Sequence, residues 1–203
     1  MPQALTHLKE TPSQTAGPYV HIGLVPNFCG IGGPWATDLG AAMVNERTRG
    51  ERIVVTGAVL DGLGTPVNDC VVEIWQADAE GLYPGRSETR GDADPDFSGW
   101  GRCPADANGV YRFETIKPGR VPAADGRPQA PHISIWIVAR GINLGLNTRL
   151  YFGDEAAANA EDPILTRIEQ KGRLKTLIAP RQGNAYRFDI RLQGPDETIF
   201  FDI

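Results

Sequence analysis

Seven short runs rich in Val, Ile and aromatic residues recur along the chain, and they constrain its fold more than any other feature. Their length and composition are typical of β-strands. The runs cover residues 52–60, 70–76, 110–115, 133–140, 148–152, 186–192 and 198–201. Clusters of Gly, Pro, Asn and Asp, such as the segment 61–69, separate several of them and supply turn chemistry. The pattern predicts a mainly β chain that folds as a sandwich.

Helical character is confined to one stretch, near residues 155–180. Asp162 is followed by Pro163, and this pair favours a helix start, because the aspartate can cap and the proline needs no N–H in the first turn. Apolar residues at helical spacing come next: Ile164, Leu165 and Ile168, and then Leu174, Leu177 and Ile178. We expect a short helical insert in an otherwise β chain.

The chain has 203 residues and no Ser/Gly-rich linker or low-complexity tract that would divide it. We therefore expect one domain over residues 1–203. Residues 1–50 are predicted to form a long N-terminal arm with loops that pack on a partner chain, and residues 51–203 are predicted to form the sandwich core. With 24 Gly and 16 Pro, much of the remainder is expected to be extended loop.

Charge and cysteine content exclude several classes of function. The net charge is −5, and the 25 acidic and 20 basic residues are interspersed, so no basic patch is available for nucleic acid or an anionic membrane. Three cysteines, Cys29, Cys70 and Cys103, are too few and odd in number for a disulfide framework, which favours a reducing compartment. No stretch has the character of a signal peptide or a membrane span. These observations predict a cytoplasmic protein.

The stretch 110–137 has the outline of a metal-binding hairpin without enough ligands. His132 and Ser134 alternate with two isoleucines, so both point to one face of a predicted strand. A metal site would need a second histidine at Ser134. The other histidines, His7 and His21, lie in an N-terminal region that we expect to form loops. The chain is therefore not expected to hold a metal by itself.

Four runs carry a resemblance to a known family. They are EIWQADAEGLY (73–83), DFSGWGRCPADANGVYRFETIKPG (96–119), APHISI (130–135) and AYRFDIRLQG (185–194). On these runs the chain resembles the intradiol ring-cleavage dioxygenases over nearly its whole length. Two further segments, TPSQTAGPYVHIGL (11–24) and ARGINLGLNTRLYFGDE (139–155), are similar to the alpha-type chain of the two-chain members of that family. The resemblance implies a β-sandwich of the intradiol-dioxygenase type.

The active chains of this family bind a non-haem ferric ion through two tyrosinates and two histidines, and this sequence matches two of those positions. Tyr83 falls at the first tyrosine and His132 at the first histidine. Val121 and Ser134 fall at the other two positions, and Gln129 replaces a nearby arginine. Ferric iron favours anionic oxygen donors and imidazole, which Val121 and a neutral serine hydroxyl do not supply. We expect five vestigial positions, with no metal and no catalytic residue in this chain, and a hydrogen bond between Tyr83 and His132.

The resemblance implies another role for this chain. In two-chain members a beta-type chain holds Fe(III), and the alpha-type chain completes the substrate pocket above it. The positions that match this pocket are Thr15, Gly17, Pro18 and Arg140, with Tyr19 as an additional candidate. Arg140 lies eight residues after His132, roughly 26 Å along an extended strand, so it cannot serve the vestigial positions. The implied partners are a beta-type chain, in alpha–beta pairs or higher multiples of them, and the substrates at the shared site.

Arg140 is suited to bind an acidic substrate. A guanidinium at a strand end, before Gly141, is well shaped to face a carboxylate. The implied reaction cleaves protocatechuate, a catechol that carries a carboxylate, between its two hydroxyl-bearing carbons. Both atoms of dioxygen are inserted, which gives 3-carboxy-cis,cis-muconate. An arginine recognises a sulfonate as well, so 4-sulfocatechol stays open as a substrate.

Two other interpretations stay open at this point. The first is a self-sufficient dioxygenase with unusual ligands, namely Tyr83 and His132 with either Tyr111 or His21. The second is a sandwich that binds sugars or proteins on an exposed aromatic platform, for which the candidates are Trp35, Trp75, Trp100 and Trp136. Because Trp75 and Trp136 lie within apolar strands, we expect both in the core, which weakens the second interpretation.

Overall fold

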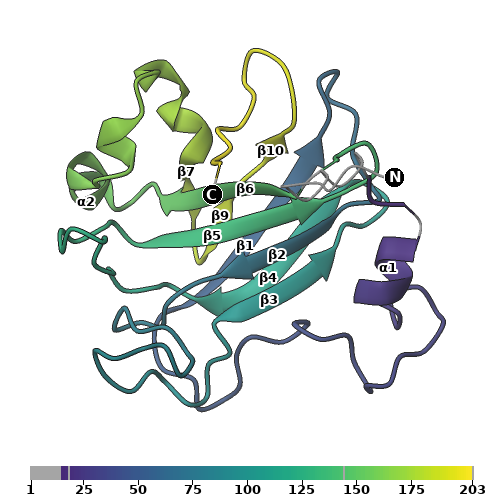
Figure 1. Ribbon diagram of the computed structural model, residues 1–203, viewed down its shortest axis with the longest axis horizontal. Helices are drawn as coiled ribbons and strands as arrows, with labels where there is room; N and C mark the ends of the chain where they lie inside the picture. Colours follow the sequence, from purple (N-terminus) through teal and green to yellow (C-terminus); the bar gives the residue numbers. More distant parts are fainter. Residues whose placement is uncertain (1–14, 18, 144, 203) are drawn as a thin grey trace, which may run out of the picture.

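Two β-sheets form a sandwich, as the strand pattern predicts (Figure 1). The computed structural model describes residues 15–17, 19–143 and 145–202. The first sheet contains β1 (Arg52–Leu60), β4 (Val110–Ile116), β8 (Arg181–Gln182), β9 (Ala185–Arg187) and β10 (Ile190–Arg191). The second sheet has the order β3 (Trp100–Pro104), β2 (Val71–Trp75), β5 (His132–Val138), β6 (Leu146–Phe152) and β7 (Ile178–Ala179).

The alternation of side chains along each strand decides which residues fill the space between the sheets. In β5, three isoleucines at positions 133, 135 and 137 are buried, whereas Ser134 and Trp136 lie on the outer face. The inward residues join one continuous apolar cluster with side chains of the first sheet, such as Phe113 and Tyr186. Burial of each isoleucine contributes roughly 1.5–3 kcal/mol relative to exposure. The outer face of β5 is therefore free to carry a site.

The helical insert is present, although its turns are tighter than expected. It consists of α2 (Ala156–Glu161) and two 3-10 helices, η1 (Leu165–Arg167) and η2 (Lys171–Leu177), and it lies beside β7 (Figure 1). Asp162 holds the turn that leads into η1, because its Oδ1 accepts the backbone N–H groups of Ile164 and Leu165 at 2.8 and 2.9 Å, but the N-cap of η1 is Ile164 and no helix begins at Pro163 as expected. Among the described residues, no helix has the length and apolarity that a membrane crossing requires.

Several elements differ from the expectation. The strand predicted at 186–192 is broken between β9 and β10, where Asp189 turns inward and accepts the backbone N–H of Ala58. The run 198–201 forms only a single bridge, between Phe201 and Asn147. Strand β3 was not predicted, because its sequence WGRCP lacks β-branched residues. These differences lie where backbone or side-chain hydrogen bonds from distant segments override local propensity.

The N-terminal arm contains a helix where loops were expected. Helix α1 (Tyr19–Leu24) follows Gly17, whose carbonyl accepts the N–H of Val20 at 3.0 Å. His21 lies on this helix, so its assignment to a loop was wrong. At six residues, the helix is too short for hydrophobic periodicity to reveal it.

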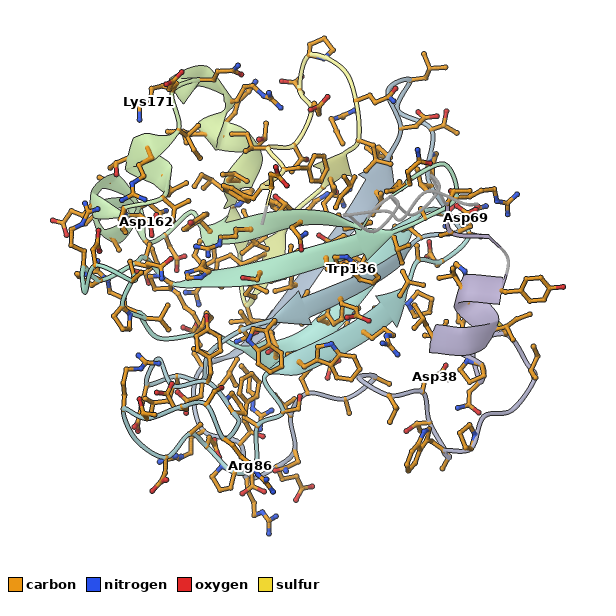
Figure 2. The ribbon with its side chains drawn as sticks, viewed as in Figure 1. Asp38, Asp69, Arg86, Trp136, Asp162 and Lys171 are labelled. Carbon is orange, nitrogen blue, oxygen red and sulfur yellow. The ribbon has the colours of Figure 1, made fainter. Side chains whose placement is uncertain are left out.

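The prediction that Trp75 and Trp136 lie in the core was also wrong. Trp75 is 43% exposed and Trp136 is half-buried, because both have the parity of Ser134 and point to the outer face of the second sheet. Figure 2 shows Trp136 on β5, at the centre of this face. Apolar strands of an antiparallel sheet can thus carry aromatic residues on the solvent side as well as on the core side.

Gly57 lies where β1 passes closest to a neighbouring backbone. A Cβ at this position would lie 1.8 Å from the carbonyl oxygen of Phe188. Gly57→Ala should therefore force β1 away from the β9–β10 segment and lower the free energy of unfolding by roughly 3 kcal/mol. Gly172→Ala is the matched control, since a Cβ there meets no atom within 4 Å, and it should change the value by less than about 0.5 kcal/mol. Equal unfolding free energies for the two variants in urea would contradict the close approach.

Candidate functional site

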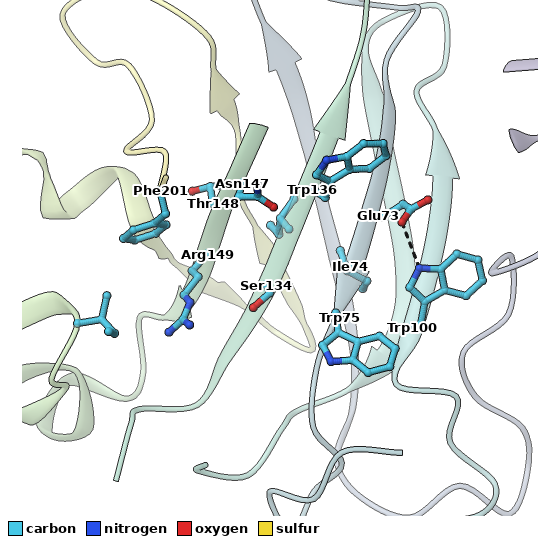
Figure 3. Close-up of a pocket in the computed structure, with 12 residues that line it drawn as sticks. Glu73, Ile74, Trp75, Trp100, Ser134, Trp136, Asn147, Thr148, Arg149 and Phe201 are labelled. Atoms are coloured by element: carbon cyan, nitrogen blue, oxygen red, sulfur yellow. Dashed lines mark hydrogen bonds between the residues drawn. The ribbon is translucent and has the colours of Figure 1, made fainter. Parts of the chain in front are cut away.

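A hollow on the outer face of the second sheet contains one of the predicted vestigial positions, Ser134 (Figure 3). Trp75 on β2, Ser134 on β5 and Arg149 on β6 lie directly opposite one another in register. The Cβ atoms of such neighbours are about 5 Å apart, so the small serine leaves space between the indole and the guanidinium. The result is a cavity of about 250 Å³.

Arg149 links the other vestigial positions, and sequence reasoning did not single it out. Its Nη1 donates a hydrogen bond to Oε1 of Gln129 at 2.8 Å. Its positive charge favours a lower pKa at both His132 and Tyr83, although burial is the larger cause at each group and raises the pKa of Tyr83. Gln129 in turn donates its backbone N–H to the carbonyl of Val121 at 2.8 Å. The positions that match an iron site are therefore gathered around a fixed cation.

His132 is buried at the end of β5 and is neutral at physiological pH. Only 4% of the residue is exposed, its Nδ1 lies 2.8 Å from the carbonyl oxygen of Ala130, and its ring packs against Tyr151. Burial lowers the pKa of His132 to about 4, and the charge of Arg149 adds to this effect. The imidazole thus behaves as a packed, buried group and does not line the hollow.

Tyr83 does not hydrogen-bond to His132, so that prediction was wrong. The ring of Tyr83 stacks on Trp75 instead, with centroids 6.2 Å apart and an angle of 6° between the planes. Burial raises the pKa of Tyr83, and the charges of Arg149 and Arg90 oppose that shift. A phenol of raised pKa is a poorer source of the phenolate that a ferric ion prefers.

The loop that carries Tyr83 is held in place by Asp78 and Gly81. Oδ1 of Asp78 accepts the backbone N–H groups of Glu80 and Leu82, each at 2.9 Å. Gly81 has a φ of +80°, and a Cβ there would lie 2.1 Å from the carbonyl oxygen of Arg120. Only glycine fits this conformation and this approach, so the loop packs directly on the turn that precedes Val121.

The residues at these positions do not fit a ferric ion. Val121 presents a buried alkyl group and Ser134 a neutral hydroxyl, where the metal requires anionic oxygen or imidazole. The two alternative ligands considered from the sequence, Tyr111 and His21, do not complete the ligand set. Tyr111 lies between the two sheets and donates its hydroxyl hydrogen to the carbonyl of Phe188, and His21 packs near Phe28. Neither lines the hollow at Ser134.

Arg140 lines a separate and more open cavity, of about 880 Å³, beyond the end of β5. Its Nε lies 2.8 Å from Oδ2 of Asp69, and its side chain is 66% exposed. The two cavities share no lining residue. Figure 2 shows Asp69 and Asp162 at opposite ends of the molecule, and Asp162 lies beside the His132 end of β5.

The structure brings part of the N-terminal arm to Arg140. The backbone N–H of Gly141 donates to Oγ1 of Thr15 at 2.7 Å, across 126 positions of the sequence. Gly17 lies two residues further along the chain. Tyr19 is 81% exposed on α1, and Pro18 lies outside the described residues. Thr15 and Arg140, predicted to serve one site, are thus adjacent in this chain.

Comparison with known proteins places the chain in a family. A family model described as Dioxygenase matches residues 25–194. The protocatechuate 3,4-dioxygenase alpha chain of Pseudomonas putida is 47% identical, over 96% of this chain and 97% of the relative. The chain belongs to the intradiol dioxygenase family.

Other members agree in sequence and in fold. The protocatechuate 3,4-dioxygenase beta chain of Burkholderia cepacia is 42% identical to this intradiol dioxygenase chain, over 77% of the chain and 71% of the relative. A solved intradiol ring-cleavage dioxygenase from Tetranychus urticae superimposes with a TM-score of 0.53 at 21% identity, covering 78% of this chain and 90% of the other. The second match shows the shared sandwich.

The low pKa of His132 predicts acid sensitivity. Its pKa is about 4 in the fold, and an unfolded histidine titrates near 6.5, so the unfolded chain takes up the proton first. The stabilisation is complete above about pH 6.5 and is lost as the pH falls toward 4, by roughly 3 kcal/mol.

The variant His132→Gln lacks this titration. The advantage of the wild type in free energy of unfolding should therefore shrink by roughly 2–3 kcal/mol between about pH 7.5 and pH 4.5. Urea denaturation of both proteins at each pH measures it. A constant difference over this range would contradict a buried neutral His132.

Proposed function

We propose that this chain is the alpha subunit of a protocatechuate 3,4-dioxygenase, and that it completes the substrate pocket of a beta subunit without binding iron itself. The observation that carries the proposal is the match to the P. putida alpha chain over 97% of that protein's length. The similarity to a beta chain supports descent of both subunits from one fold. Fold alone does not assign function, so the site residues must support the division of roles.

The site chemistry supports iron on the partner and none here. Two of the four expected donor positions, Val121 and Ser134, have no ligating group of the required kind, and Arg149 places a positive charge next to Ser134. A beta subunit with the complete set would hold Fe(III), which binds and activates the catechol. Cleavage between the hydroxyl-bearing carbons with both atoms of O2 then gives 3-carboxy-cis,cis-muconate.

Arg140 is proposed to bind the carboxylate of protocatechuate at the shared pocket, with Thr15, Gly17, Pro18 and Tyr19 close to the same substrate. The exposed ion pair with Asp69 supports this role, because such a pair is worth about 0.2–1 kcal/mol and is easily exchanged for a better anion. The bond from Gly141 to Thr15 fixes the arm beside the guanidinium. These residues would orient the ring and exclude water.

The proposal includes the assembly and its location. Residues 1–50 are proposed to pack on the beta subunit, and the alpha–beta unit is proposed to repeat in a larger complex. The three cysteines, Cys29, Cys70 and Cys103, are all free, which supports a location in the reducing cytoplasm.

Iron content tests the division of roles. The chain purified alone should be colourless and free of iron, and its co-expression with the beta subunit should give a coloured complex that cleaves protocatechuate. Metal analysis and visible absorbance measure both. Stoichiometric iron in the chain alone would overturn the proposal.

Kinetics of the assembled complex test Arg140. Arg140→Ala should raise KM for protocatechuate by roughly 10- to 100-fold, since loss of a charge-assisted hydrogen bond costs about 1.5–3 kcal/mol. The iron content of the complex should not change. The matched control is Arg112→Ala, which removes an exposed arginine paired with Glu114 on β4 of the first sheet, and it should leave KM unchanged. An unchanged KM in a fully assembled Arg140→Ala complex would remove Arg140 from the pocket.

A further inference from the structure

The hollow at Ser134 has the walls of a binding site, and the proposed function does not use it. In Figure 3, Ser134 lies between the indole of Trp75 and the guanidinium of Arg149, and Phe201 lies on the far side of Arg149. The lining combines these groups with Ile164 and Trp136, so aromatic and aliphatic surface surrounds one cation and one hydroxyl. Small-molecule sites commonly have this composition, with a few polar groups that fix the orientation of the ligand.

Arg149 supplies the charge of the hollow and has donors to spare. A guanidinium carries five N–H groups in a planar fork, of which one donates to Gln129 and another engages the hydroxyl of Tyr151. Within the described ranges, Arg149 forms no ion pair with a carboxylate. The remaining donors can engage a planar anion in a bidentate manner.

Among the described residues, Glu73 is the acidic residue that lines the hollow, and it is already engaged. Oε1 of Glu73 accepts a hydrogen bond from Nε of Arg102 at 2.7 Å, and Oε2 accepts one from Nε1 of Trp100 at 3.3 Å. Its charge is therefore balanced on the side of the hollow away from Arg149. The end of the hollow at Arg149 and Ser134 keeps a net positive charge.

We propose that this cavity binds a small aromatic carboxylate, with the carboxylate on Arg149 and Ser134 and the ring against Trp75. The volume of about 250 Å³ exceeds the ~150 Å³ that accommodates benzene in an engineered apolar cavity, so one ring with a carboxylate fits. The exposed indole of Trp75 offers a face for stacking, and the Ser134 hydroxyl donates to the second carboxylate oxygen. The site is distinct from the one proposed at Arg140, with which it shares no lining residue.

Benzoate is the probe, and benzyl alcohol is its neutral counterpart. Titration of the full-length chain, followed by calorimetry and by tryptophan fluorescence, should show saturable binding of one benzoate. Benzyl alcohol should bind at least about 10-fold more weakly, because it lacks the charge that Arg149 recognises. Equal affinities, or no saturable binding of benzoate, would overturn the proposal.

Variants locate the site. Arg149→Met should weaken benzoate binding by at least about 10-fold, and Arg149→Lys should bind benzoate more tightly than Arg149→Met but more weakly than the wild type, because the ammonium keeps the charge and loses the bidentate fork. Ser134→Leu fills the hollow without touching the bond between Arg149 and Gln129, so it should abolish binding even if Arg149→Met fails to fold. Arg112→Ala is the control and should bind normally. Loss of binding in Arg140→Ala, with normal binding in Arg149→Met and Ser134→Leu, would assign benzoate to the other cavity and overturn the proposal.

The assembled complex gives a second measurement. Because the proposed beta site also takes aromatic acids, the readout is the number of benzoate molecules bound per alpha–beta unit. This number should fall by one in complexes that contain Arg149→Met. An unchanged number would show that the partner covers the hollow, and the proposal would fail for the complex.

Discussion

The buried carboxylate of Asp162 is the interaction on which the organisation of the vestigial site depends. It accepts the N–H of Ala130 at 2.7 Å and those of two residues that begin η1, and the hydroxyl of Tyr151 lies 3.4 Å away. One side chain thereby joins the helical insert, the residues that lead into β5, and Tyr151 on β6 of the second sheet. A buried carboxylate is tolerated only when its oxygens are satisfied, and here four donors surround it.

This anchorage fixes the position of His132 and, through the pairing of β5 with β6, that of Arg149. His132 follows Ala130 by two residues and is directly opposite Tyr151. Ser134 is then opposite Arg149 by the same register. The floor of the hollow is therefore set by strand pairing, which cannot slip by one residue without turning the isoleucines of β5 outward. The buried isoleucines of β5 thus hold the strand in place, and the side chains on its outer face give the hollow its chemical character.

The sequence predicted the sandwich and the long strands well, because strict alternation over five or more residues has few alternative explanations. Strand β1 was predicted with its observed ends. The tight break at Asp189 and the short helix α1 were missed, since both depend on hydrogen bonds rather than on periodicity. Trp75 and Trp136 were misplaced because apolar composition was taken for burial. The sequence places Trp136 on the same strand face as Ser134, whereas the matching position of Trp75 follows only from the pairing of β2 with β5.

The candidate site was predictable only in part. Tyr83, Val121, His132 and Ser134 were found by resemblance, which also assigned Thr15 and Arg140 to one pocket, whereas the bond between Thr15 and the Arg140 loop was seen only in the structure. Arg149 was missed, because its importance depends on which strand lies beside Ser134, and a single sequence does not give strand order. In the predicted strand 148–152, Arg149 lies two residues before Tyr151 and so faces the same side of the sheet. This observation pointed to a site only once β6 was known to pair with β5.

The position of Arg149 also bears on how such a chain changes over evolutionary time. A simple reversal would place a tyrosine at 121 and a histidine at 134, but the guanidinium would still stand beside the second of these, held by Gln129. A cation beside that position repels a ferric ion and so opposes part of the attraction that the new ligands would supply. Restoring the two ligands at 121 and 134 would therefore leave this repulsion in place, and a metal-binding chain would need a change at Arg149 as well.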